Sequence, residues 1–221
     1  MSPSSDSSAP RLVCRWRHRF DGFSLLELLA VIAVMALLAA LVVPAVSGIS
    51  KSYQMTSASH SVLNHLVQAR QVAITKGYPV QVRFYKLPGY GEASSAAPSQ
   101  FRAMQLFIES DPTVSGNTAT VPLKALSKPV FFNAPVEILP GQSSLLTLPL
   151  NTSPQESVGG YGQNYRYVSF RFKPSGQTDL PATATGLTLA LSEGASGSTL
   201  PANFRAIEID AANGTVRDYA P

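Results

Sequence analysis

Hydrophobic residues are spread unevenly along the chain, and the densest run lies near the N-terminus. Residues 28–50 form an uninterrupted stretch of 23 residues without a charged side chain, rich in Leu, Ala, Val, Ile and Met. About 20 apolar residues in helical form are enough to cross the hydrocarbon core of a bilayer. The pattern therefore predicts a transmembrane helix over about residues 28–50.

Two residues depart from this apolar pattern. Glu27 is the only ionisable residue between Phe23 and Ser50, and a carboxylate costs roughly 2.5 to 3.5 kcal/mol at the centre of a membrane helix. Pro44 lies in the second half of the run, where it removes one backbone hydrogen bond and is expected to kink or loosen the helix. A role as a membrane anchor alone does not explain either residue.

Beyond Lys51 the apolar residues recur at steps of three and four, which predicts an amphipathic helix that buries one stripe against a head domain. Gly77 offers a left-handed cap and Pro79 prevents continuation, so the predicted helix covers residues 23–77. The stripe consists of Met55, Ala58, Val62, Leu66, Ala69 and Ala73, with Leu63 and Ile74 widening it.

Residues 78–221 contain short runs of alternating apolar and polar residues, which predict β-strands. Asn213-Gly214 predicts a closing hairpin, and residues 110–129 are expected to form a loop because turn residues are frequent there. We therefore predict an α+β fold, with a β-rich extracytoplasmic head over residues 78–221. The expected strands cover residues 79–87, 101–109, 130–139, 144–150, 165–173, 187–191 and 204–210.

Composition and charge narrow the function classes. Charged residues make up 14% of the chain, against about 25% in a typical globular domain, which favours a head that packs against copies of itself. The formal net charge is +4, but four arginines and two aspartates in residues 1–22 supply +2 of it. The remaining charge near +2 does not by itself predict a nucleic-acid surface. Cys14 is the only cysteine, so residues 23–221 have no thiol chemistry.

The first 22 residues form a cationic leader that precedes the apolar run. Arg15, Arg17 and Arg19 lie directly before Asp21 and Gly22. Basic flanks of a membrane helix stay on the cytoplasmic side. We therefore expect a single-pass membrane protein in which the chain after the helix faces outward.

The segment Gly22-Phe23-Ser24-Leu25-Leu26-Glu27, followed by an apolar helix, resembles the processing signal of type IV prepilins and type II secretion pseudopilins. The resemblance implies that a prepilin peptidase cuts after Gly22 and that Phe23 becomes an N-methylated N-terminus. It also implies that Glu27 pairs with the amine of Phe23 on a neighbouring subunit. Pro44 would mark the point where the helix locally melts during filament assembly.

The head carries a second, shorter set of matches. The order of helix, strand, turn and closing strand pair resembles the GspH/FimT branch of minor pseudopilins, and more narrowly the Verru_Chthon cassette protein D group. The resemblance implies a pilin-like fold. The residues that carry it are Ala69, Arg70, Gln71, Ala73, Ile74, Gly77, Phe172, Pro174 and Gly176.

These patterns favour a structural minor pilin or pseudopilin subunit of a type IV pilus-like or type II secretion filament. Its expected partners are prepilin peptidase, other pilin or pseudopilin subunits and the inner membrane. The resemblance implies a single-pass protein of the inner membrane, with the C-terminal head in the periplasm or on the cell surface. One alternative is a pilin-like receptor for DNA or another ligand, although nucleic acid is not the favoured partner. Another is a single-pass anchored periplasmic domain that does not polymerise. The receptor alternative rests on arginines that alternate with aromatic residues: Arg70, Arg83, Arg102, Arg166, Arg171 and Arg205.

Catalysis has little support in the sequence. His60 and His65 are five residues apart, so on a helix they point to different sides, which is poor geometry for a metal site. We therefore expect no enzyme activity, no catalytic residue, no metal and no cofactor.

Overall fold

The computed structural model describes residues 23–93, 96–110, 113–115, 118–120, 122–153, 158, 165–191, 200–201 and 203–220. Side chains at 41–47, 113–115, 118–120 and 152–153 lie outside this description. The chain consists of two compact units, Met1–Ala45 and Val46–Pro221. The second unit thus joins the amphipathic helical segment to the β-rich head.

The helix α1 (Leu25–Lys76) ends where the sequence predicts. Gly77 has a φ of 72°, and its N–H donates to the carbonyl of Ala73 at 3.0 Å, as expected for a left-handed cap. Every residue of the predicted stripe is at most 6% exposed, from Met55 to Ala73. Leu63 is half-buried and Ile74 is 43% exposed, so the stripe is narrower than expected on that side.

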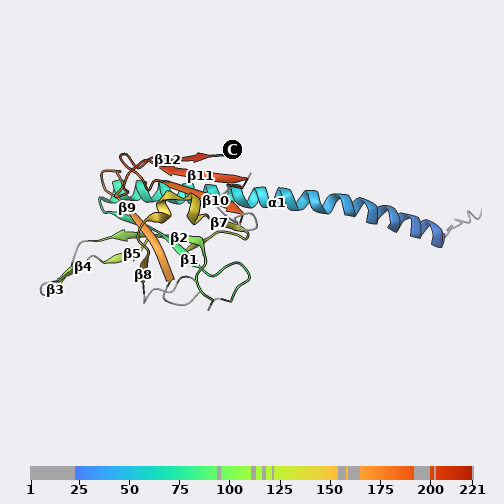
Figure 1. Ribbon diagram of the computed structural model, residues 1–221, viewed down its shortest axis with the longest axis horizontal. Coiled ribbons are helices and arrows are strands. Elements are labelled where there is room, and N and C mark those ends of the chain that lie inside the picture. Colours follow the sequence, from blue (N-terminus) through green and yellow to red (C-terminus); the bar gives the residue numbers. More distant parts are fainter. Residues whose placement is uncertain are drawn as a thin grey trace, which may run out of the picture. The chain divides into compact units, whose positions relative to one another are not determined.

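The head is built on an antiparallel sheet, which confirms the predicted α+β fold (Figure 1). Its strand order is β12-β11-β10-β7-β2-β1-β9-β8, with β5 and β6 also paired to β2, while β3 and β4 form a separate pair. The strands are β1 (Val80–Leu87), β2 (Gln100–Glu109), β3 (Thr113–Ser115), β4 (Thr118–Thr120), β5 (Leu123–Ala125), β6 (Val130–Phe131), β7 (Val136–Ile138), β8 (Asn151–Ser153), β9 (Tyr165–Phe172), β10 (Gly186–Leu191), β11 (Phe204–Ile209) and β12 (Val216–Tyr219).

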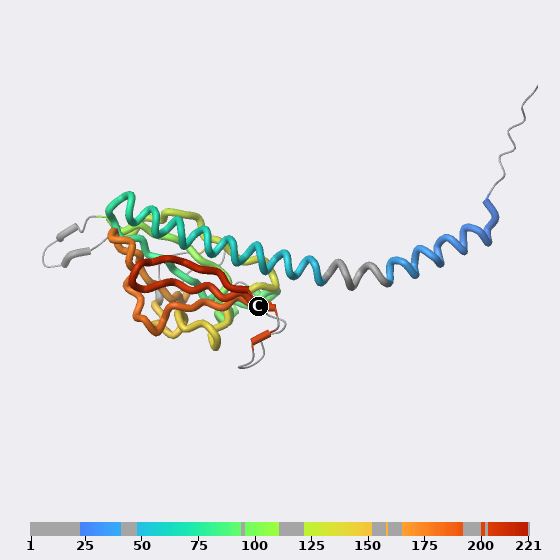
Figure 2. Tube along the Cα trace, turned by 90° about the horizontal axis from the view of Figure 1, so that it is seen from above, coloured from blue at the N-terminus to red at the C-terminus, as the bar shows by residue number. Residues whose placement is uncertain are grey.

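The core lies between the helix and one face of this sheet. Val82 on β1 is opposite Leu106 on β2 and Phe170 on β9, and these side chains belong to the same buried cluster as the helix stripe. The closing strands, red in Figure 2, run beside the helix. There the Ser59 hydroxyl donates to the Asp218 carboxylate at 3.0 Å. The helix is therefore held to the end of the chain as well as to its middle.

The opposite face of the central strands is buried as well, although its side chains are polar. Arg83 is 2% exposed and lies between the rings of Phe107 and Tyr167, at 4.2 and 4.5 Å from their centroids. Its Nε donates to the side-chain oxygen of Gln81 at 2.8 Å. Such cation–π contacts are strongest where water is excluded. The alternation along β1 therefore separates two buried layers rather than an inside from an outside.

Three local predictions were wrong. Residues 144–150 were expected as a strand, but the structure has two 3-10 helices, η1 (Pro140–Gln142) and η2 (Ser144–Thr147). The hydroxyls of Ser143 and Ser144 accept hydrogen bonds from Thr188 N and Gly186 N. These side-chain bonds fasten the segment to β10 and compete with strand formation.

The other two errors concern turn-rich sequence. Residues 110–129, expected as a loop, contain β3, β4 and β5. Strand β5 pairs with the C-terminal end of β2. The expected strand 130–139 is split into β6 and β7 by residues 132–135, which include a cis Ala134–Pro135 bond. Strands of two or three residues depend on their pairing partners, which local propensity does not encode.

Candidate processing and assembly segment

The helix begins with a side-chain cap just after the predicted cleavage junction. The Glu27 N–H donates to the Ser24 hydroxyl oxygen at 3.1 Å, and the Leu28 N–H donates to the Ser24 carbonyl at 3.1 Å. Ser24 is therefore the N-cap residue, and Glu27 occupies the third helical position. Sequence reasoning missed this role, although the pattern Ser-x-x-Glu is the known signal of a capping box.

Two of the three processing and assembly residues near this cap are described, and both are exposed. Phe23 lies outside the helix and is 79% exposed. Glu27 is exposed in the first turn, where the helix dipole favours a negative charge. Gly22 lies outside the described residues. Among the described residues, no side chain forms an ion pair with Glu27.

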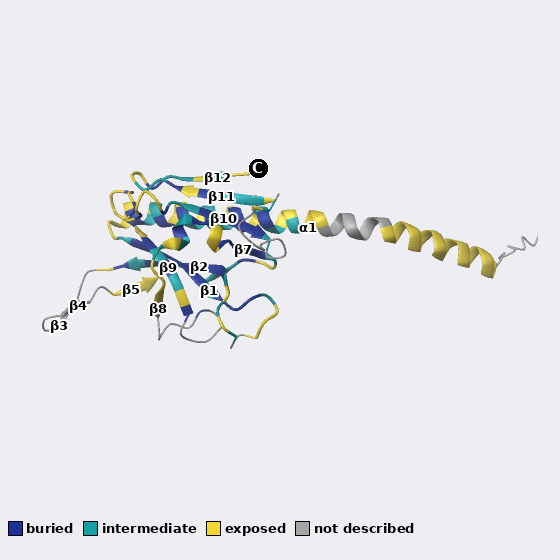
Figure 3. Cartoon of the chain, viewed as in Figure 1, coloured by how far each residue is buried: buried dark blue, intermediate teal, exposed yellow. Residues whose placement is uncertain are grey.

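Apolar side chains are exposed all along the first part of the helix. Every residue from 25 to 40 is exposed (Figure 3), including Leu29 at 59% and Leu37 at 66%. Monomeric soluble proteins rarely leave such a large contiguous apolar surface in water. This segment therefore needs lipid or another protein chain to cover it.

The structure describes the predicted membrane span and Pro44 only in part. The backbone at Pro44 belongs to α1, but the side chains at 41–47 lie outside the described residues, so the kink stays a prediction. Within the part of the chain that is described, no helix is both long and apolar enough to cross a membrane.

In the head, Arg70 joins the helix to two turns that are far away in sequence. Its Nε donates to the carbonyl of Asn213 at 3.0 Å and to that of Gly176 at 3.3 Å. Gly176 closes the turn that starts at Lys173, since its N–H donates to the Lys173 carbonyl at 2.8 Å. The short motifs of the head thus meet at one point, which we call the Arg70 lock: Arg70, Gly176, Asn213 and Gly214.

The two glycines of the Arg70 lock are required by geometry. Gly176 and Gly214 have φ angles of 85° and 67°, in the left-handed region that L side chains rarely adopt. A Cβ added at Gly214 would lie 2.1 Å from the Gly176 carbonyl oxygen, and one at Gly176 would lie 3.1 Å from the Ile74 side chain. No larger residue fits at Gly214 without moving the backbone.

Comparison with protein families bears on the N-terminal segment. Residues 17–43 match the prokaryotic N-terminal methylation motif, and this range contains Gly22, Phe23 and Glu27. The chain therefore carries a prepilin-type N-terminal segment. The narrower resemblances to the GspH/FimT branch and to the Verru_Chthon group stay predictions.

The prepilin-type chain was also compared with individual proteins. Among solved structures, it is similar to the minor pseudopilin EpsH from the type 2 secretion system of Vibrio cholerae. The identity is 11%, the match covers 76% of this chain and 98% of that one, and the TM-score is 0.38. Comparison with curated proteins gave no match.

Five of the six arginines of the receptor alternative are engaged by other groups of the prepilin-type chain, and two of the five are buried. Arg83 lies in its aromatic sandwich, and Arg102 is 5% exposed and donates to the Pro88 carbonyl at 2.6 Å. Arg171 pairs with Glu109 at 2.5 Å, and Arg205 lies 3.8 Å from the Asp218 carboxylate. With Arg70 also engaged, Arg166 is the exposed member of the six for which the described residues supply no such partner. This set of six arginines therefore offers a phosphate backbone few cations that are not already engaged.

The histidines and other candidate ligands do not converge on a metal site. His65 Nδ1 lies 2.7 Å from the Ser61 carbonyl one turn earlier, and His60 is exposed on the same helix. In the described part of the chain, no three His, Cys, Asp or Glu residues come together in a way that could hold a metal ion.

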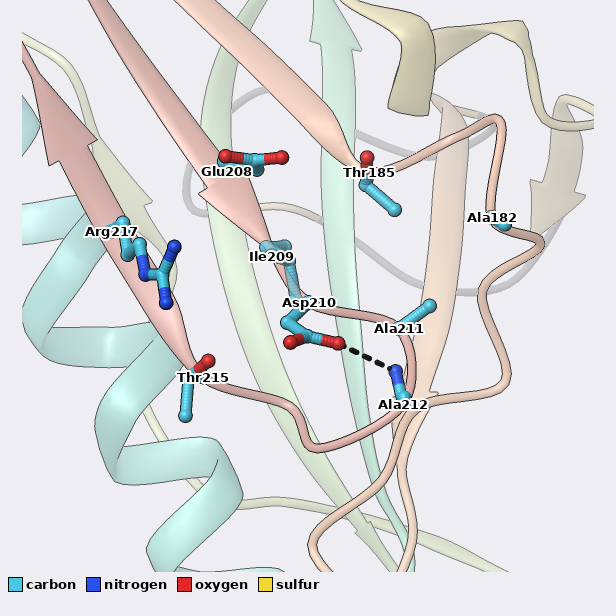
Figure 4. A pocket seen from close by; sticks show the side chains of 9 residues that line it. All are labelled: Ala182, Thr185, Glu208, Ile209, Asp210, Ala211, Ala212, Thr215 and Arg217. Carbon is cyan, nitrogen blue, oxygen red and sulfur yellow. Dashed lines mark hydrogen bonds between the residues drawn. The ribbon is translucent and has the colours of Figure 1, made fainter.

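An open pocket of about 300 Å³ lies beside the closing hairpin (Figure 4). Glu208 and Arg217, which are opposite each other on β11 and β12, line it together with Thr185. Asp210 also lines it, but its Oδ1 accepts from the N–H of Ala212 at 2.9 Å and so supports the turn. The pKa of Arg217 is raised by a hydrogen bond with the Tyr219 side chain and by the negative charges of Tyr219, Glu208 and Asp210. The open pocket is thus lined by a strand pair and its turn, and the Asp210 carboxylate is engaged in holding that turn.

Proposed function

We propose that this protein is a structural subunit of a type IV pilus-like or type II secretion filament. Prepilin peptidase would cut after Gly22, and the subunit would wait in the inner membrane, anchored by its N-terminal helix, with the head on the outer side. The role is structural: the protein is the substrate of a processing enzyme and is not an enzyme itself.

One observation carries the proposal. Residues 25–40 expose an apolar surface on every side of a helix, directly after a prepilin-type junction and with Glu27 as its only ionisable group. A lipid bilayer could cover the apolar residues, but it offers no partner for the carboxylate. A neighbouring subunit offers both, because the amine of a processed Phe23 would neutralise Glu27. The burial of two charges is offset only when they pair well.

The test is the fate of Glu27 variants of the full chain in cells that assemble the filament. We expect Glu27→Ala to be cut after Gly22 as the parent chain is, and to be lost from sheared filaments. Glu27→Asp is the matched control, because it keeps the charge, and it should retain part of the incorporation. Incorporation of Glu27→Ala at the level of the parent chain would refute the pairing.

A further inference from the structure

The pocket beside the closing hairpin contains charges of both signs that do not pair with each other. Glu208 and Arg217 lie directly opposite each other on β11 and β12, and both are exposed. Within the described part of the chain no ion pair joins them, and their charged ends are apart in Figure 4. Opposite charges on paired strands normally stabilise a sheet by direct contact. Here both charges instead face the pocket.

Both groups also retain hydrogen-bonding capacity. A guanidinium carries several N–H donors, and the hydrogen bond of Arg217 with Tyr219 leaves most of them available. The Glu208 carboxylate accepts no hydrogen bond from any group that the structure describes. An anionic group and a cationic group of one ligand can therefore bind side by side on the two strands.

The balance of charge in the pocket is negative. Its ionisable lining residues are Glu208, Asp210 and Arg217, so two carboxylates accompany one guanidinium. Asp210 is already bound within the turn, since its Oδ1 accepts from the Ala212 N–H at 2.9 Å and its Oδ2 from the Asn213 side chain at 2.7 Å. It therefore contributes mainly its charge. A ligand that is complementary to this pocket has one negative group and more than one positive group.

Size and lining restrict the ligand further. The volume of about 300 Å³ lies at the lower end of the ~300–1,000 Å³ range of ligand pockets, which suits a molecule as small as an amino acid. The methyl groups of Ala182, Ala211 and Ala212 line the pocket and can cover the methylene groups of a long charged side chain. The Thr215 hydroxyl oxygen in the same lining is buried and has no hydrogen-bond partner among the described residues, an unfavourable state that a polar ligand group relieves.

We propose that this pocket binds a free basic amino acid such as lysine or ornithine. The α-carboxylate binds the Arg217 guanidinium, whose parallel N–H donors match the two carboxylate oxygens, and the α-ammonium group binds the Glu208 carboxylate. These two ligand groups share one carbon, and residues opposite each other on paired strands are about 5 Å apart. The side-chain ammonium group reaches the charge of Asp210, about 6–7 Å further along the same face of β11. This binding site does not depend on the proposed filament function.

Saturation-transfer NMR of the full chain in detergent, with L-lysine as the probe, tests the site. We expect a lysine signal several-fold above that of three analogues that each lack one charged group. Cadaverine lacks the carboxylate, norleucine lacks the side-chain ammonium group, and Nα-acetyl-lysine lacks the α-ammonium group, as the end of a peptide chain does. Glutamate, with the opposite balance of charge, should give no signal above the detergent blank. A lysine signal no stronger than those of the analogues, or an equal glutamate signal, would overturn the proposal.

Variants of the pocket locate the signal. Arg217→Gln should lower the lysine signal several-fold without lowering the cadaverine signal, because only lysine has a carboxylate for Arg217 to bind. Ala212→Leu fills the pocket without changing its charge and should lower both signals. Arg166→Gln is the matched control, since Arg166 is exposed on β9 and does not line the pocket. Circular dichroism checks that each variant is folded. A lysine signal that survives both pocket variants, or falls equally in the control, would overturn the site and leave the filament proposal standing.

Discussion

The two halves of the helix solve the same problem in different ways. Residues 25–40 and residues 55–73 are both rich in apolar side chains. The first set is exposed throughout, whereas each residue of the stripe in the second set is at most 6% exposed. The second half finds its cover within its own chain, in strands far away in sequence. The first half has no such cover among the described residues, so its pattern is explained by an external environment. Apolar content alone does not distinguish the two roles, whereas the periodicity does.

A matched pair of truncations tests this difference most strongly. Leu66→Ala removes a side chain that is 0% exposed and should lower the free energy of unfolding of the head by about 2–5 kcal/mol. Leu29→Ala removes one that is 59% exposed and should change it by less than about 0.5 kcal/mol. Urea unfolding of the full chain in detergent, followed by near-ultraviolet circular dichroism, measures both. Equal losses would mean that residues 25–40 belong to the core of the head.

A second comparison sets Gly214, a left-handed glycine of the Arg70 lock, against Gly91, a left-handed glycine outside it. Gly91→Ala should cost about 1–2 kcal/mol, because φ is 80° but the added Cβ meets nothing within 4 Å. Gly214→Ala should cost clearly more, because its Cβ would lie 2.1 Å from the Gly176 carbonyl oxygen. The same unfolding measurement ranks the two variants. If Gly214→Ala were no worse than Gly91→Ala, the hairpin would not be fixed against the Gly176 turn.

The smallest effect is expected at Glu137 on β7, which is 7% exposed. Burial raises the pKa of this carboxyl, so the folded state binds its proton more tightly than the unfolded chain does. The contribution is favourable at pH below the unfolded value and is lost as pH rises through the raised pKa. Glu137→Gln, which stays neutral, should therefore raise the Tm modestly at pH 7 and not at pH 4. Thermal scans at the two pH values check this, and an equal shift at both would contradict it.

Several features could be predicted from the sequence because they are local. The buried stripe, the Gly77 cap, the turn at Gly176 and the Asn213-Gly214 hairpin each depend on neighbouring residues and turn chemistry. The prepilin-type junction at Gly22, Phe23 and Glu27 is likewise a contiguous motif. These are the cases where a few adjacent residues determine the backbone.

The features that could not be predicted depend on distant partners. The 3-10 helices at 140–147 exist because Ser143 and Ser144 bind β10 through their hydroxyls. Arg83 alternates like a surface residue but is enclosed by Phe107 and Tyr167. Arg70 stood out only as part of a short motif, and its role depends on where residues 176 and 213 come together. Single-sequence patterns do not encode such long-range encounters.

The N-terminal residue of the exported protein is the most direct test of the account. Mass spectrometry of the chain extracted from membranes or filaments should find a species that begins at Phe23, carries an N-methyl group and retains the apolar helix. A species that begins at Gly48 would contradict the account, because the surface proposed to hold subunits together would have been removed.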